Sequence, residues 1–176
     1  MKSSTVPTMY EAYTKAAEKC RYPLHVGVTE AGTERMGSIS SAAGIGGLLL
    51  RGIGDTIRVS LTDEPIKEVA AAKDILKAVG LRNDGVKIVS CPTCGRTRIN
   101  LIELAKKAEE LLKNCEKNIT VAIMGCVVNG PGEAKEADIG VAGGDGCGII
   151  FKKGEILRKV PEDCLLTELM AEIEKL

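Results

Sequence analysis

The chain has 176 residues, which is enough for one ordinary domain or two small ones. Its 24 basic and 24 acidic residues balance, so no net charge attracts nucleic acid or an anionic membrane. Aromatic residues make up 2% of the chain, too few for the stacking platforms that bind single-stranded nucleic acid. We therefore predict a protein that binds neither nucleic acid nor a membrane.

The uncharged stretches of the chain are short. The N-terminal residues lack the unbroken apolar run of a signal peptide, and the longest uncharged runs, 36–50 and 118–132, are shorter than the roughly 20 apolar residues that span a bilayer. We therefore expect a cytoplasmic location. Thiols stay reduced there, so the seven cysteines are expected to be metal ligands, a redox pair or buried apolar residues rather than disulfides.

Helices and strands alternate in the first half of the chain. The pattern predicts three helices and two strands: a helix over 7–20, a short buried strand over 23–28, a glycine-loosened helix over 37–52, a strand over 55–61 and a helix over 64–79. Gly80 is expected to end the last of these helices. Such alternation favours parallel strand pairing in βαβ units.

The pattern of residues changes after residue 80. The pattern predicts a strand over 85–90, an amphipathic helix over 98–115, a strand over 118–128 and a tight turn at Asn129–Gly132. A short glycine-rich meander and a last helix opened by Pro161 are expected to follow. We predict two domains, residues 1–80 and residues 81–176.

Four of the cysteines have an unremarkable interpretation or an ambiguous one. Cys20 and Cys115 fall on the apolar stripes of predicted helices, and Cys164 falls in the first turn of the last one, so all three are expected to be buried apolar residues. Cys147 lies in a glycine-rich loop and could approach a metal site, but its glycine neighbours by themselves indicate only a turn.

Cys91 and Cys94 form a C-x-x-C pair at the end of one strand, and Cys126 ends another. The ends of two strands can converge at one sheet edge, and the turn after Cys126 can return Glu133 to it. Three thiolates with an oxygen ligand are typical of an iron–sulfur cluster with one open iron. Zinc held by the three cysteines and Cys147 is the alternative, because the only histidine, His25, lies in an apolar strand and is expected to be structural.

Several motifs together resemble a known family. The segments "CPTCGRT" and "MGCVVNGPGEA", preceded in order by "PLHVGVTEAGT" and "GIGDTIRVSLT", resemble the C-terminal part of the 4-hydroxy-3-methylbut-2-enyl diphosphate synthase family of the non-mevalonate isoprenoid pathway. The resemblance covers essentially the whole chain. It implies an α/β fold: the end of a (β/α)8 TIM barrel, then a small α/β iron–sulfur domain resembling the sulfite-reductase type. Only two complete βα units precede that domain, so we expect a C-terminal part that lacks about six of the barrel's strands.

The resemblance also implies a cofactor, a reaction and partners. A 4Fe–4S cluster would be held by Cys91, Cys94, Cys126 and Glu133. The reaction would be the reductive ring opening and dehydroxylation of 2-C-methyl-D-erythritol 2,4-cyclodiphosphate, with ferredoxin or flavodoxin as the electron donor. The complete enzyme is expected to be a homodimer. Two other functions stay open for the chain: a non-catalytic iron–sulfur electron-transfer module and a zinc-binding structural domain.

The family also implies roles for residues that would otherwise attract little attention. Glu30 and Glu133 are the implied catalytic residues. The implied substrate-binding residues are Lys2, Thr29, Arg58, Ser60 and Asn129. One departure from the family pattern stands at Ser40, where a lysine is expected.

Overall fold

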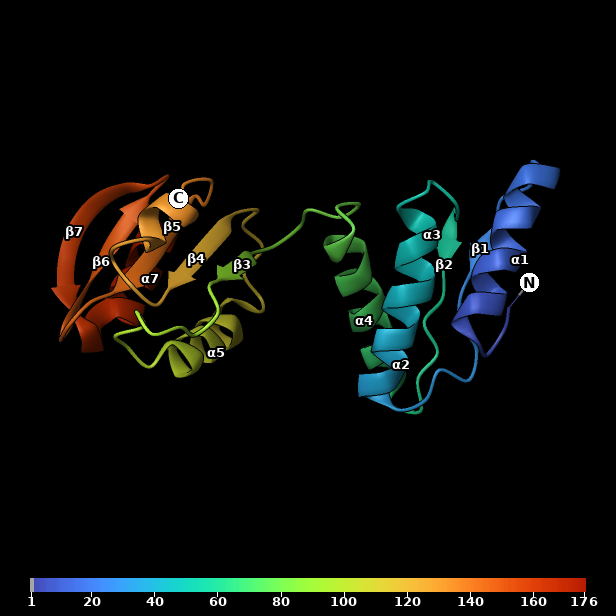
Figure 1. Ribbon diagram of the computed structural model, residues 1–176, viewed down its shortest axis with the longest axis horizontal. Coiled ribbons are helices and arrows are strands. Elements are labelled where there is room, and N and C mark those ends of the chain that lie inside the picture. The colour runs from blue at the N-terminus through green and yellow to red at the C-terminus, as the bar shows by residue number, and fades with distance from the viewer. Residues whose placement is uncertain (1) are drawn as a thin grey trace. The chain divides into compact units, whose positions relative to one another are not determined.

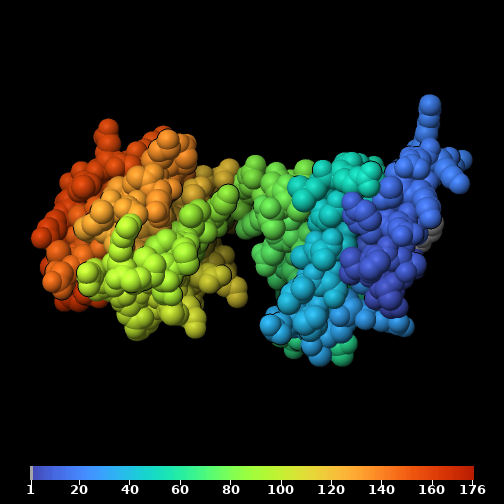
Figure 2. Space-filling view, in the orientation of Figure 1, coloured from blue at the N-terminus to red at the C-terminus, as the bar shows by residue number. Residues whose placement is uncertain are grey.

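The computed structural model describes residues 2–176. They fall into two compact units, one up to Asn83 and one from Asp84 to Leu176. In the space-filling view each unit is one contiguous body, the first coloured blue to green and the second lime to red (Figure 2). Within the described residues, no helix has both the length and the apolar character needed to cross a bilayer.

The first unit alternates helices with short parallel strands (Figure 1). Its elements are α1 (Val6–Lys19), β1 (His25–Val26), α2 (Glu34–Ser41), a π-helical segment (Ala42–Gly46), α3 (Gly47–Leu49), β2 (Thr56–Ile57) and α4 (Pro65–Ala78). Strands β1 and β2 pair in parallel, and a parallel bridge joins Ser3 to Val28. The predicted parallel pairing is therefore confirmed, although the regular strands are shorter than expected.

Close packing explains the glycine-rich helix of the first unit. The predicted helix over 37–52 is a continuous helical run that begins at Glu34 and widens to a π-helix at Ala42. A Cβ atom on Gly44 would stand 2.5 Å from the Met9 side chain and 3.0 Å from that of Val28. Glycine at this position therefore lets the helix lie directly on the strands and on α1.

The second unit is built on a five-stranded sheet in the order β3-β4-β5-β6-β7. Its elements are β3 (Lys87–Ser90), α5 (Leu101–Leu112), β4 (Thr120–Met124), α6 (Gly130–Glu133), β5 (Ile139–Gly143), β6 (Cys147–Lys152), β7 (Glu155–Pro161), a 3-10 turn (Glu162–Cys164) and α7 (Leu165–Glu174). Strands β3, β4 and β5 are parallel, whereas β6 and β7 continue the sheet antiparallel.

Both faces of this sheet are apolar. Successive side chains of a strand point to opposite faces, and the central strands are apolar at successive positions. One face packs against α5 and α7, and its core includes Val121, Ile123, Val141, Ile150, Leu101 and Leu169. The other face, which we call the α6 face, carries Ala122, Met124, Ala142, Ile149 and Phe151 and packs against Ala134 and Ala137. The two layers of core make the central strands fully buried.

Three local expectations need correction. The tight turn expected at Asn129–Gly132 is instead the start of the short helix α6, which has a proline in its first turn, where no hydrogen bond is lost. Cys20 lies just beyond α1 in extended backbone, with Pro23 soon after it. Cys115 lies beyond α5, in the turn that its N–H closes on the Leu112 carbonyl. Both cysteines are therefore half-buried at helix ends rather than within a helix stripe.

We expect the two units to differ in local stability. Strands β1 and β2 have two residues each, whereas β4, β5 and β6 lie inside a sheet covered on both faces. Amide hydrogens of residues 120–124 and 139–152 should therefore exchange with deuterium more slowly than those of residues 25–28 and 56–60. Hydrogen exchange followed by mass spectrometry, corrected for intrinsic rates, measures this. Equal protection of the two sets would contradict the expectation.

Candidate functional site

Three parallel strands of the second unit end at one edge of the sheet. Cys91 follows the last residue of β3, and Cys126 follows the end of β4 by two residues. Strand β6 runs in the opposite direction, so its first residue, Cys147, lies at the same edge, beside the end of β5. We call this end of the sheet, where β3, β4 and β5 finish and β6 begins, the cysteine edge.

The C-x-x-C loop is held against the residue that precedes Cys126. The Gly125 N–H donates a hydrogen bond to Cys91 Sγ (3.2 Å), and the Arg98 N–H donates to the Gly125 carbonyl (3.0 Å). A Cβ atom on Gly125 would meet Thr97 Oγ1 at 2.9 Å, so glycine permits this approach. The hydrogen bond from Gly125 fixes the Cys91 sulfur beside the end of β4.

Cys94 is the exposed member of the pair. Its N–H donates to Thr97 Oγ1 (3.1 Å). The backbone N–H of Arg96 hydrogen-bonds its sulfur and, with smaller contributions from Thr97 and the Arg96 charge, lowers the pKa of the Cys94 thiol below its usual value. The C-x-x-C loop therefore favours the thiolate of Cys94, the form in which a cysteine binds a metal.

Glu133 ends helix α6, which is anchored over the ends of β4 and β5. The Gly130 N–H donates to the Cys126 carbonyl (3.1 Å). A Cβ atom on Gly130 would stand 2.8 Å from Met124 and 2.9 Å from Ala142, so the helix lies directly on the α6 face. Asn129 Nδ2 donates to Glu133 Oε1 (3.4 Å), which places the two predicted site residues side by side.

The predicted ligands are not gathered around one point. From residue 2 to residue 176, no group of three or more His, Cys, Asp or Glu side chains is arranged to hold a metal ion. The expectation that Cys91, Cys94 and Cys126 gather without a metal is therefore not met. Hydrogen bonds join the C-x-x-C loop to Gly125, but they do not bring the three sulfur atoms to one point. The ligand set stays a prediction, to which the contact between the C-x-x-C loop and Gly125 lends support.

The remaining candidates have structural surroundings. His25 Nδ1 lies 2.7 Å from Thr56 Oγ1, a hydrogen bond between the neighbouring strands β1 and β2. Burial, with a smaller effect of the Asp163 charge, raises the pKa of the Cys164 thiol. The His25 contact is consistent with a structural role. Cys164 is half-buried in the 3-10 turn before α7 rather than in the first turn of that helix.

In the first unit, a second group of predicted residues lies where parallel segments end. The Thr29 N–H donates to the Ser3 carbonyl (3.1 Å), and the Arg58 N–H donates to the Val26 carbonyl (2.9 Å). Lys2 therefore lies beside the end of the β1 segment, which carries Thr29 and Glu30, and the β2 segment carries Arg58 and then Ser60. Four of the predicted residues therefore follow two adjacent parallel segments. The fifth, Lys2, directly precedes Ser3, which pairs with the first of these segments.

Glu30 has an unusual backbone. Its φ is 55°, in the left-handed region that residues other than glycine seldom adopt. Such conformations cost about 1–3 kcal/mol and are common at functional sites. The Glu30 side chain is exposed. Ser40, which stands where the family has a lysine, is half-buried on α2.

Residues that the sequence motifs did not single out link the loop after β1 to the loop after β2. The Thr62 N–H donates to the Gly32 carbonyl (2.9 Å). Lys67 Nζ donates to Glu34 Oε2 (2.9 Å) and to Asp63 Oδ2 (3.0 Å), so it links the start of α2 to the loop after β2. The i,i+4 spacing of Asp63 and Lys67 is a sequence signal for one of these pairs. Its link to Glu34 depends on tertiary structure alone.

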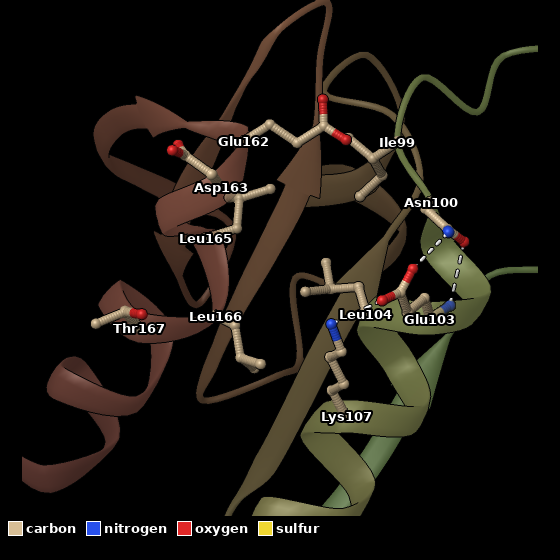
Figure 3. Close-up of a pocket in the computed structure, with 10 residues that line it drawn as sticks. All are labelled: Ile99, Asn100, Glu103, Leu104, Lys107, Glu162, Asp163, Leu165, Leu166 and Thr167. Carbon is tan, nitrogen blue, oxygen red and sulfur yellow. Dashed lines mark hydrogen bonds and ion pairs between the residues drawn. The ribbon is translucent and has the colours of Figure 1, made fainter.

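A cavity of about 350 Å³ also lies in the second unit, between the start of α5 and the start of α7 (Figure 3). Ile99, Leu104 and Leu165 line it, and Asn100 and Glu103 hydrogen-bond each other at its rim. None of the predicted site residues lines this cavity. We therefore assign it no part in the site.

We expect the cysteines of the second unit to differ in reactivity. The lowered pKa of Cys94 gives it a larger thiolate fraction at neutral pH than Cys164, whose pKa is raised. Iodoacetamide at pH 7 should therefore alkylate Cys94 faster than Cys164, as measured by peptide mass spectrometry. Thr97→Val should slow that reaction, because it removes one of the hydrogen bonds to the sulfur. Faster alkylation of Cys164 would contradict the prediction.

The fold and the two groups of strand-end residues define an α/β protein with a barrel-type βα unit followed by a cysteine-bearing α/β unit. The model of the GcpE TIM-barrel domain matches residues 1–73, and that of the GcpE protein C-terminal domain matches residues 87–175. The chain belongs to the GcpE family.

Curated relatives carry the same name as the family inferred from the motifs. The 4-hydroxy-3-methylbut-2-en-1-yl diphosphate synthase (flavodoxin) of Clostridium perfringens is 62% identical over 99% of this chain. Those of Clostridium tetani and Ruminiclostridium cellulolyticum are 60% and 58% identical over 100% of it. The chain spans about half the length of these relatives, 50% in each case. The resemblance to this family and to a TIM barrel is therefore confirmed.

Proposed function

We propose that this chain supplies barrel strands and the cluster-binding unit of a 4-hydroxy-3-methylbut-2-enyl diphosphate synthase. The proposed reaction is the reductive opening and dehydroxylation of 2-C-methyl-D-erythritol 2,4-cyclodiphosphate. The observation that carries the proposal is the hydrogen bond from Gly125 to Cys91, because it sets the C-x-x-C loop against the strand end that leads to Cys126. A family match over both units supports it.

The proposed cofactor is a 4Fe–4S cluster held by Cys91, Cys94, Cys126 and Glu133. The donor set fits such a group in its chemistry, because cysteine thiolates are the usual ligands of iron–sulfur clusters and the pKa of the Cys94 thiol is lowered. When bound, the cluster would supply electrons and an iron that can act as a Lewis acid. A carboxylate at the fourth position is a harder ligand than a thiolate and yields more readily to a substrate oxygen. We propose that the second unit resembles the sulfite-reductase type of domain.

The chain's own residues would bind and orient the substrate. Lys2 and Arg58 are proposed to hold the diphosphate by charge-assisted hydrogen bonds, with Ser60 and Thr29 as neutral donors. Thr29, Arg58 and Ser60 follow the ends of parallel segments, where barrel enzymes place their active sites. Lys2 lies next to Ser3 on the neighbouring segment. The exposed carboxylate of Glu30 is proposed to exchange a proton with the substrate. Asn129 is proposed to donate its side-chain amide to the substrate.

The proposed partners follow from the family. The printed name of the relatives includes flavodoxin, so flavodoxin is the proposed electron donor, with ferredoxin as the alternative. We further propose that the complete enzyme is a cytoplasmic homodimer.

Anaerobic reconstitution of the chain with ferrous iron and sulfide tests the proposal. We expect about four irons and four sulfides per chain, with the broad visible absorption of a cluster. Adding the cyclic diphosphate should then change the electron paramagnetic resonance spectrum of the reduced cluster. Retention of zinc without sulfide would favour the zinc-binding structural domain. A cluster whose resonance spectrum does not change when the cyclic diphosphate is added would favour the electron-transfer module.

A further inference from the structure

We infer that Lys67 is a positioning residue of the proposed substrate site, which holds the loop that carries Glu30 against the loop that follows Ser60. This inference rests on the proposed function, because that function assigns Glu30 and Ser60 their roles. In this role Lys67 acts through the two loops and does not contact the substrate. The hydrogen bonds made by the first turns of α4 support the inference.

Lys67 joins two loops that are far apart in the sequence, the β1 loop (residues 29–33) and the β2 loop (residues 60–64). Its Nζ donates to Glu34 Oε2 (2.9 Å), and Glu34 begins α2 directly after the β1 loop. The same Nζ donates to Oδ2 of Asp63 (3.0 Å), which lies in the β2 loop. One ammonium group therefore bridges the two loops through two ion pairs.

The partners of Lys67 keep this bridge charged. Hydrogen bonds to Glu34 and then to Asp63 raise the pKa of the Lys67 ammonium above its usual value. The backbone N–H of Glu64 and, with a smaller effect, Lys67 lower the pKa of the Asp63 carboxyl. Near neutral pH the ammonium and the Asp63 carboxylate are therefore both ionised.

The β2 loop is also fixed at the residue next to Ser60. The Leu61 N–H donates to Glu68 Oε1 (2.8 Å), and Glu68 adjoins Lys67 in α4. The Leu61 side chain packs on α2, where a Cβ atom on Gly37 would stand 2.5 Å from Leu61 Cδ2. Lys67 therefore acts from a helix that already holds the end of the β2 segment.

The β1 loop carries the strained backbone of Glu30, whose φ is 55°. Such conformations persist where the surrounding structure fixes them. The Gly32 carbonyl accepts a hydrogen bond from the Thr62 N–H (2.9 Å), which is one link between the two loops. Lys67 adds a second link at Glu34, so the strained residue lies in a loop that is held on its C-terminal side.

The ion pairs of Lys67 are better suited to positioning than to stabilising the unit. The Lys67 side chain is 39% exposed and that of Glu34 is 56% exposed, and ion pairs at such exposure contribute little to the free energy of unfolding. A link between two loops nevertheless restricts their relative movement, and misplacing a binding group weakens binding. We therefore expect the loss of Lys67 to change local movement and binding rather than overall stability.

Two substitutions that break the bridge from opposite sides test the inference. Lys67→Met removes a positive charge and Glu34→Ala removes a negative one, so they change the attraction for an anion in opposite directions. Both should nevertheless speed the hydrogen exchange of the Thr62 N–H about two- to fivefold, measured by nuclear magnetic resonance. Both should also weaken the binding of inorganic pyrophosphate, the probe for the diphosphate site, about two- to fivefold.

Two further variants are the controls. Lys67→Arg should restore the exchange and the pyrophosphate affinity, because arginine keeps the charge and can donate to both carboxylates. Lys73→Met removes an exposed lysine of the same helix and should change neither property. Urea unfolding should show near-parental stability for every variant. A marked fall in the urea midpoint of Lys67→Met would assign Lys67 to stability and overturn the inference.

The outcomes separate this inference from the proposed function. A parent chain that does not bind pyrophosphate would overturn the proposed diphosphate binding, and this inference with it. A parent that binds pyrophosphate, but with unchanged Thr62 exchange in Lys67→Met and Glu34→Ala, would overturn the role of Lys67 alone. Faster exchange with unchanged affinity, or opposite changes of affinity in the two variants, would also overturn it, because the bridge would then act only on local structure or only through its charge.

Discussion

Replacing Cys91 with serine should lower the cluster content of the reconstituted chain at least about tenfold. Losing a residue that merely supports a metal ligand typically costs 10–100-fold in affinity, and losing the ligand itself should cost no less. Serine offers a hydroxyl that stays protonated at neutral pH and binds iron poorly. Iron and sulfide analysis after anaerobic reconstitution measures the loss.

Cys115→Ser is the matched control for that experiment. Cys115 lies in the same unit and is also half-buried, but it follows the far end of α5 rather than the cysteine edge. Its replacement should leave cluster content unchanged. The Cys91→Ser variant should still fold, because a serine oxygen can accept the Gly125 N–H in place of sulfur. Near-normal cluster content in Cys91→Ser would show that Cys91 is not a ligand.

Phe151→Ala should cause the largest loss of stability, about 3–5 kcal/mol in the free energy of unfolding of the second unit. The Phe151 side chain is fully buried on the α6 face. The tip of its ring packs against Gly140, where a Cβ atom would stand only 2.5 Å away, so the ring is tightly packed. Removing the ring leaves a cavity that the flanking strands cannot close. Urea unfolding of the unmodified and variant chains measures the difference.

Two controls sharpen the stability experiment. Phe151→Leu keeps most of the apolar volume and should cost less than Phe151→Ala. Leu157→Ala removes an exposed side chain from the edge strand β7 and should change the free energy of unfolding by about 0.5 kcal/mol or less. A loss below about 1 kcal/mol for Phe151→Ala would mean that the α6 face repacks around the missing ring.

The local pattern predicted much of this fold. The helices and strands lie close to their predicted positions, and the alternation of helices with strands predicted the parallel pairing of β1 with β2. The C-x-x-C pair and the "MGCVVNGPGEA" segment were specific enough to indicate the family. These features depend on residues close together in the chain, and periodicity, turn residues and motifs record such features directly.

The arrangement of the site required the tertiary structure. Hydrophobic periodicity does not encode which strand pairs with which, so it could not show that Cys147 shares an edge with Cys91 and Cys126. Nor could it show the bond from Gly125 to Cys91, which joins residues far apart in the chain. Where a turn was expected at Asn129, the chain forms helix α6, whose first residue, Gly130, packs closely on Met124 and Ala142. The sequence by itself thus determined the elements, the family and the kinds of ligand, whereas long-range strand pairing and close packing decided which side chains meet.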